Sequence, residues 1–279
     1  MNGLEARRRG VRPLLWALLT AVVVLYGAPF VYLLLTSFKP PLETIAVPPA
    51  VLPSTWTVAN YVDALGREGV VASFINSIST ATISTILSLV LAVPAAYGIT
   101  RFRTRVGQFF VLAALVTRMV PPVSVGIPLL STLGFLGLTD TPTGTAIAHT
   151  TISLPLSILL MASFFEAVPE ELDEAARVDG CSRLGALWRV VLPVASGGMA
   201  VTAIFAFLAS WNEFLFALLL TSVRAQTTPI VIANFQTQFG LDWGPMTALA
   251  TVYSVPVILL TLVLQRHIVA GLTLGAVKG

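Results

Sequence analysis

A few polar side chains interrupt the long apolar runs of this chain, and their chemistry is charge pairing and hydrogen bonding. Arg118 lies inside one such run, three residues before a pair of prolines at 121–122. A guanidinium in hydrocarbon is costly and usually faces a cavity or a partner. Asn212 and Glu213 lie in another run and are the candidates to meet Arg118 or to line a polar pathway, and we expect Arg118 and Glu213 to be coupled. The alternative is a structural ion pair or an arginine that snorkels to the interface. The pathway candidates are Arg118, Trp211, Asn212, Glu213 and Phe214.

No residue pattern indicates catalysis or metal binding. The two histidines, His149 and His267, are far apart in sequence, and neither has a cluster of Glu, Asp or Cys around it. A single cysteine, Cys181, excludes an intramolecular disulfide framework. The chain has no Gly-x-x-x-x-Gly-Lys-Ser/Thr sequence, the motif that cradles nucleotide phosphates. The sequence therefore predicts that the chain is not an enzyme and binds no metal or cofactor itself.

The elements that carry these residues are predicted to be membrane spans. Of the 279 residues, 56% are hydrophobic and 10% are charged, whereas soluble domains have about 25% charged residues. A spanning helix needs about 20 apolar residues, so the expected fold is an all-α integral membrane protein. Because proline removes a backbone donor, the helix that carries Arg118 must kink or break at 121–122. Six spans are predicted near residues 14–37, 74–99, 107–132, 145–167, 195–220 and 246–264.

Basic residues are distributed unequally between the two sides of these spans. Three lie on one side, Lys39, Arg67 and Arg224, against twelve on the other. Cytoplasmic loops retain the excess of Lys and Arg, so the side with twelve, and both termini, are predicted to be cytoplasmic. No segment resembles a nucleic-acid-binding module. The twelve are Arg7, Arg8, Arg9, Arg12, Arg101, Arg103, Arg105, Arg177, Arg183, Arg189, Arg266 and Lys278.

The outer loop at 39–73 contains five prolines. Prolines stop helix extension and favour extended backbone. The loop is therefore predicted to be extended, either as a surface linker or as a docking surface for an extracellular partner.

The second span carries a stripe of small polar residues. Asn76, Thr80, Ser84 and Ser88 recur at steps of four, which places them on one side of a helix. Such residues most often mediate helix packing in membranes. Packing is the favoured interpretation, and lining of a pathway is the alternative.

The loop between the fourth and fifth spans, 168–193, is predicted to form two short helices joined by a glycine turn. Pro169 suits the first position of a helix, and acidic residues at 170, 171 and 173 complement the positive end of its dipole. Gly180 can end this helix with a positive φ. Ser182 offers an N-cap for the second helix, whose apolar residues repeat at helical spacing until Pro193. Without a partner this segment is an amphipathic connector.

The same loop resembles the EAA motif of permease subunits in bacterial ATP-binding cassette (ABC) importers. Val190 stands where the family has isoleucine, which preserves a β-branched apolar side chain. The sequence WNEF at 211–214 and the C-terminal GLTLGAVKG at 271–279 are similar to the carbohydrate branch, in the subunit of the maltose-type second permease. The resemblance assigns ATPase coupling to Glu174, Ala175, Ala176, Gly180, Val190, Leu192 and Pro193.

The resemblance also implies a domain organisation. The chain would be a single transmembrane permease domain, 1–279, with six spans and a coupling helix between spans four and five. It would have cytoplasmic tails at 1–13 and 265–279 and the coupling loop at 168–193, and would lie in the bacterial cytoplasmic membrane.

The implied function is import of a sugar or oligosaccharide delivered by an extracytoplasmic binding protein. The implied partners are a second homologous permease, two ATPase subunits that use ATP and Mg, the binding protein, the sugar and membrane lipid, without nucleic acid. In such importers one permease can hold most of the substrate contacts. This chain would then either bind substrate or form one wall of the pathway.

Two other functions are alternatives. Related permeases with the same motifs carry other polar solutes, such as glycerol phosphodiesters. An ion-coupled secondary transporter would work without an ATPase and would often carry buried acidic residues. Glu213 is the one intramembrane candidate for such a residue.

Overall fold

The structure is a computed structural model that describes residues 2–102, 105–237 and 240–276. The fold is all-α, and the sheet in the described residues is one pair of two-residue strands. The chain divides into two compact units. One comprises residues 1–68 and 234–254, and the other comprises residues 69–233 and 255–279.

The first unit contains the outer loop that follows the first span. Its elements are α1 (Asn2–Ser37), the 3-10 helix η1 (Pro41–Ile45), α2 (Ala59–Gly66), the antiparallel strands β1 (Gln236–Thr237) and β2 (Gly240–Leu241), and the beginning of α13 (Trp243–Ala276). Asn60 on α2 fixes the end of α1, since its Nδ2 donates to the carbonyl oxygens of Ser37 at 2.9 Å and Lys39 at 2.8 Å.

The expectation that this loop is extended throughout was wrong. A proline is tolerated in the first turn of a helix, and Pro41 begins η1 in this way. The last proline of the loop is Pro53, so the backbone donors of α2 are intact.

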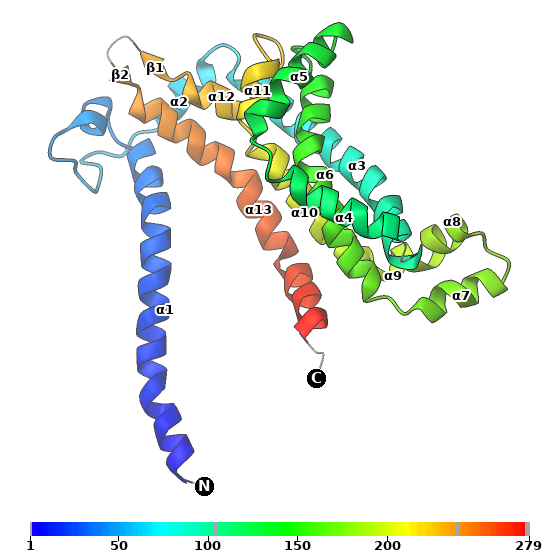
Figure 1. The fold of residues 1–279 in the computed structure, drawn as a ribbon. Helices are drawn as coiled ribbons and strands as arrows, with labels where there is room; N and C mark the ends of the chain where they lie inside the picture. Colours follow the sequence, from blue (N-terminus) through cyan, green and yellow to red (C-terminus); the bar gives the residue numbers. More distant parts are fainter. Residues whose placement is uncertain (1, 103–104, 238–239, 277–279) are drawn as a thin grey trace. The chain divides into compact units, whose positions relative to one another are not determined.

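The second unit is built on three packed helices, α3 (Val70–Phe102), α6 (Pro142–Glu166) and α10 (Ser196–Trp211). Within this unit, Figure 1 shows α7 and α8 at one end of these helices and α5 and α11 at the other end. The remaining elements are α4 (Arg105–Thr117), α5 (Pro122–Phe135), α7 (Glu170–Val178), α8 (Arg183–Ala186), the π-helical turn η2 (Leu187–Val191), α9 (Leu192–Val194), α11 (Leu215–Leu220), α12 (Thr228–Ala233) and the rest of α13.

The polar stripe of α3 packs against α6. Thr80, Ser84 and Ser88 are fully or almost fully buried. Ser88 Oγ lies 2.6 Å from Ser153 Oγ, and Thr150 Oγ1 donates to Ser84 Oγ at 3.3 Å. Small hydroxyl side chains let the two helices approach closely and satisfy each other's polar groups. The packing interpretation is confirmed for Ser84 and Ser88.

Among the described residues, four helices are long and apolar enough to cross a membrane, over residues 15–37, 70–102, 142–166 and 243–262. In two further cases, a pair of consecutive helices meets this criterion only when its two helices are taken together. Phe109–Thr117 and Pro122–Phe135 are bent by 96°, and Arg183–Val194 and Ser196–Trp211 are bent by 84°. The total is six, as predicted, if each bent pair counts as one span, but the second pair begins at Arg183, inside the loop predicted at 168–193.

The breaks differ in how well they were predicted. The break at the proline pair is confirmed, because α4 ends at Thr117 and α5 begins at Pro122. The continuous span predicted at 195–220 was wrong, because α10 ends at Trp211 and the separate helix α11 begins at Leu215.

A carboxylate between α5 and α6 organises the loop after α11. Asp140 accepts hydrogen bonds from the backbone N–H groups of Ser222, Val223, Arg224 and Ala225 at 3.0–3.3 Å. Burial alone would raise the pKa of Asp140, but the N–H groups of Ser222, Ala225 and Arg224 and the Ser222 hydroxyl lower it more. The net pKa lies well below the ordinary value for aspartate, so the carboxylate stays ionised and ties the loop to α6.

Candidate coupling surface and membrane-depth site

The loop after α6 forms the helix, turn and second helix expected from its sequence. The prediction placed the first helix at 169–179, and α7 spans Glu170–Val178 with Pro169 as its N-cap. Gly180 has a φ of +88°, a left-handed conformation that glycine adopts without steric cost. The Ser182 hydroxyl accepts a hydrogen bond from the Gly185 backbone N–H at 3.1 Å and caps α8. The predicted turn and cap are confirmed.

The residues of the motif divide between two environments. Glu174, Ala175 and Gly180 are exposed, whereas Ala176 is 6% exposed. Of the three later motif residues, Val190 is half-buried, Leu192 is buried and Pro193 is exposed. The motif therefore contributes both to packing under α7 and to the outer surface of the loop.

Apolar side chains accompany the exposed part of the motif. Val178 is 87% exposed, Leu184 is 63% exposed and Trp188 is 55% exposed. Exposed apolar groups rimmed by charges are typical of a surface that another protein covers. We call four exposed residues of α7 and its turn the docking surface: Glu174, Ala175, Val178 and Gly180.

At membrane depth, Glu213 lies in the break between α10 and α11. Its carboxylate accepts hydrogen bonds from the backbone N–H groups of Phe216 at 3.0 Å and Ala217 at 3.2 Å, so it caps α11. His149 Nε2 on α6 lies 3.0 Å from Glu213 Oε2. His149 Nδ1 lies 2.8 Å from Ser210 Oγ. The side chains of His149 and Glu213 are 0% and 8% exposed, so the pair is buried.

The predicted pairing of Arg118 with Glu213 was wrong. Arg118 is exposed at the break between α4 and α5, and its side chain has no ion pair or hydrogen bond with another described residue. Glu213 instead takes His149 because α6 packs directly against α10. Sequence reasoning missed His149 because nothing near it in the sequence indicates its partner. Within the described ranges, no group of three or more His, Cys, Asp or Glu side chains could hold a metal ion.

The other residues of the WNEF sequence have separate environments. Trp211 is 1% exposed and stacks on Phe207, with ring centroids 5.5 Å apart. Asn212 is exposed, and its side-chain amide donates to the Leu208 carbonyl at 2.9 Å. Phe214 is 39% exposed. Pathway lining by these residues stays a prediction.

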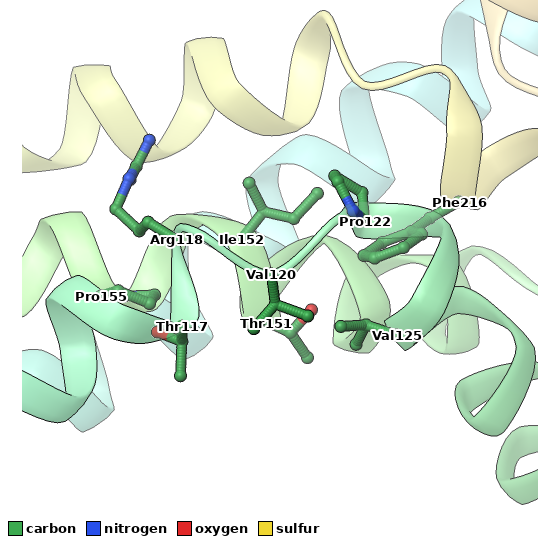
Figure 2. A pocket seen from close by; sticks show the side chains of 9 residues that line it. All are labelled: Thr117, Arg118, Val120, Pro122, Val125, Thr151, Ile152, Pro155 and Phe216. Carbon is green, nitrogen blue, oxygen red and sulfur yellow. The ribbon is translucent and has the colours of Figure 1, made fainter.

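A pocket of about 320 Å³ lies beside Arg118 in the second unit. Figure 2 shows Arg118 and Thr117 toward one end of the pocket and Pro122 and Phe216 toward the other. Thr151 of α6 contributes a second hydroxyl to the lining. Sequence reasoning identified Arg118 but missed Thr151 and Phe216, because these are unremarkable residues on other helices. The pocket combines a guanidinium, two hydroxyls and an aromatic ring within a mostly apolar wall.

Comparisons with known proteins show what kind of chain carries these features. Residues 85–273 match the family of binding-protein-dependent transport system inner membrane components. The chain is 37% identical to the trehalose transport system permease protein SugB of Mycobacterium tuberculosis, over 95% of this chain and 97% of that protein. It is 33% identical to the trehalose/maltose transport system permease protein MalG of Thermococcus litoralis, over 94% of this chain and 95% of that protein.

A solved structure agrees at the level of the fold. A chain in the crystal structure of a bacterial ABC transporter that imports the acidic polysaccharide alginate matches with a TM-score of 0.78, at 21% identity, over 95% of this chain and 98% of that chain. The present chain belongs to the family of inner membrane components of binding-protein-dependent transport systems. It is a membrane-embedded permease subunit, which confirms the resemblance drawn from the EAA motif and does not support an ion-coupled secondary transporter.

Proposed function

We propose that this chain is one permease subunit of an ATP-driven importer for a sugar or oligosaccharide that an extracytoplasmic binding protein delivers. The observation that carries the proposal is the docking surface, where Glu174 and Ala175 are exposed beside the positive-φ turn at Gly180. The two relatives named for trehalose and maltose, both aligned over nearly the whole chain, support a sugar as substrate.

The energy for transport comes from a separate polypeptide in this proposal. The chain lacks a phosphate-binding glycine-rich motif, so ATP and Mg²⁺ belong to two ATPase subunits beneath the permease. A second homologous permease completes the pathway. The docking surface then faces the cytoplasm, in line with the basic residues predicted on that side, which include Arg177, Arg183 and Arg189.

The pocket beside Arg118 is the candidate position for the sugar. A neutral sugar needs hydrogen-bonding groups and an apolar face to stack on. The Arg118 guanidinium and the hydroxyls of Thr117 and Thr151 supply the first, and the Phe216 ring supplies the second. The size of about 320 Å³ lies at the lower end of ordinary ligand pockets.

Uptake by the reconstituted transporter tests this proposal. The chain is co-expressed with the permease, ATPase and binding protein encoded beside it, and uptake of radiolabelled trehalose and maltose into proteoliposomes is measured. We expect ATP-dependent uptake of at least one sugar. Uptake driven by an ion gradient without ATP would contradict the proposal, and uptake of neither sugar would exclude trehalose and maltose as the substrate.

Two substitutions test the docking surface in the same assay. Glu174→Lys reverses an exposed charge, and Gly180→Val places a β-branched side chain at positive φ. Each should lower ATPase co-purification and uptake by about tenfold, the equivalent of losing about 1.4 kcal/mol of binding free energy. The control is Glu166→Lys, which reverses an exposed acidic residue at the end of α6, outside the motif. Normal uptake by the first two variants at normal expression would exclude the docking role.

A further inference from the structure

A buried hydrogen bond joins the coupling helix α7 to α3. The Tyr97 hydroxyl donates to Asp173 Oδ1 at 2.7 Å. Tyr97 is 4% exposed and Asp173 is 8% exposed. Hydrogen bonds to a charged acceptor are stronger than neutral ones, and a buried carboxylate left without its donor pays a desolvation cost. Water therefore cannot replace this contact without loss.

Asp173 differs from the other acidic residues of α7. Glu170, Glu171 and Glu174 are exposed, whereas Asp173 and Ala176 are buried. Residues three apart share a side of a helix, so Asp173 and Ala176 mark the side of α7 that packs into its own unit. The docking surface lies on other positions of the same helix. Asp173 thus contributes to an inner contact, and its acidity is not explained by the helix dipole alone.

The end of α3 also contacts the chain on either side of α7. Before α7, the Val168 carbonyl accepts a hydrogen bond from Arg101 Nη2 at 3.0 Å. After α7, the Arg183 guanidinium carbon lies 4.4 Å from the centre of the Phe102 ring. The last turns of α3 therefore contact the coupling loop at three places: before α7, within α7 and after α7.

We propose that Tyr97 and Asp173 form a positioning pair that makes α7 and α3 move as one body when an ATPase displaces the docking surface. The inference rests on the proposed function, because it presupposes the ATPase. The α3 helix carries Ser84 and Ser88, which bond to α6. A displacement of α7 therefore reaches the core of the unit through α3 rather than through the chain connection to α6 alone.

The variants separate this role from simple packing. Tyr97→Phe removes only the hydroxyl, and Asp173→Ala removes the acceptor. Asp173→Asn keeps an acceptor oxygen in nearly the same shape and should retain most of the function. Tyr61→Phe is the matched control, since it removes the hydroxyl that lies 2.7 Å from Ser37 Oγ in the other unit.

The measurement is made on the complete transporter with cysteine-free partner subunits. Spin labels are placed on Cys181 and on Val90→Cys, an exposed position of α3, and their distance is measured by pulsed EPR without nucleotide and after trapping with ATP and vanadate. We expect the same distance in both states for the unaltered pair. In Tyr97→Phe and Asp173→Ala we expect a nucleotide-dependent shift or broadening. ATP hydrolysis stimulated by the binding protein should fall at least about fivefold in these two variants, with ATPase co-purification unchanged.

The outcomes distinguish the inference from the proposed function. Failure of any ATPase to co-purify with the unaltered chain would overturn the proposed function and this inference with it. If the ATPase binds normally, the inference alone is overturned by a nucleotide-dependent distance change in the otherwise unaltered chain. Equal behaviour of Tyr97→Phe and Tyr61→Phe would also overturn it.

Discussion

The pairing of Glu213 with His149 sets the chemistry of the break between α10 and α11. Glu213 has two tasks, since it caps α11 through the N–H groups of Phe216 and Ala217 and contacts His149 on α6. Burying a carboxylate is costly unless it is paired and hydrogen-bonded. The two sets of contacts together explain why an acidic side chain is tolerated at this depth.

A double-mutant cycle tests this pairing. His149→Leu leaves Glu213 buried without its partner, and such losses cost about 3–5 kcal/mol. Glu213→Gln keeps the cap but removes the charge. Unfolding midpoints in detergent should show that the double variant loses less than the sum of the single losses, with a coupling of about 1 kcal/mol or more. In the matched cycle of Arg118→Ala with Glu213→Gln, the losses in stability should add. Coupling between Arg118 and Glu213, together with additive losses for His149 and Glu213, would contradict the structure.

At the scale of elements, the features that could be predicted are those with local signals. The turn at Gly180 and the cap at Ser182 follow from residues within a few positions of each other. The break before Pro122 follows from proline chemistry. The break at Glu213 was missed although its capping contacts are local, and the partner of the buried carboxylate, His149, lies on another helix.

Contacts between helices could not be predicted for a physical reason. Tyr97 and Asp173 are 76 residues apart, and His149 pairs with Glu213 on a different helix. A helix that is apolar on all sides gives no pattern that identifies its inward side. The polar stripe of α3 is the exception, and there the predicted packing was confirmed for Ser84 and Ser88.

The loop anchored by Asp140 gives a pH-dependent prediction at this scale. Burial alone would raise the pKa of Asp140 in the folded chain, but hydrogen bonds from the N–H groups of the loop after α11 lower it more. An aspartate whose pKa is lower in the folded chain than in the unfolded chain stabilises the fold at pH values above its unfolded pKa, about 4. This stabilisation is lost as the pH falls through the folded pKa. Asp140→Asn should lower the unfolding midpoint at pH 7, and the difference from the unaltered chain should shrink as the pH falls below about 4. A difference that stays constant or grows on acidification would contradict the role of the ionised carboxylate.

At the scale of the whole molecule, we propose that the docking surface is coupled to the pocket beside Arg118 in the same unit. In the proposed mechanism, the docking surface on α7 binds the ATPase, the hydrogen bond from Tyr97 to Asp173 transmits the movement of α7 to α3, and the hydroxyl contacts transmit it to α6. Thr151 of α6 lines the pocket beside Arg118, so the same helix reaches the candidate sugar site. The central claim is that the ATPase covers the docking surface.

Cys181 allows that claim to be measured directly, because it is the only thiol in the chain and follows Gly180 in the turn. A membrane-impermeant maleimide is applied to the purified permease pair, with and without the ATPase, and labelling of this chain is followed by mass spectrometry. Val223→Cys combined with Cys181→Ser is the control, since it moves the thiol to a side chain that is 82% exposed in the loop after α11, at the other end of the same unit. We predict that the ATPase slows labelling at Cys181 and leaves labelling at position 223 unchanged. Equally rapid labelling of Cys181 with and without the ATPase would contradict it and would place the docked surface elsewhere.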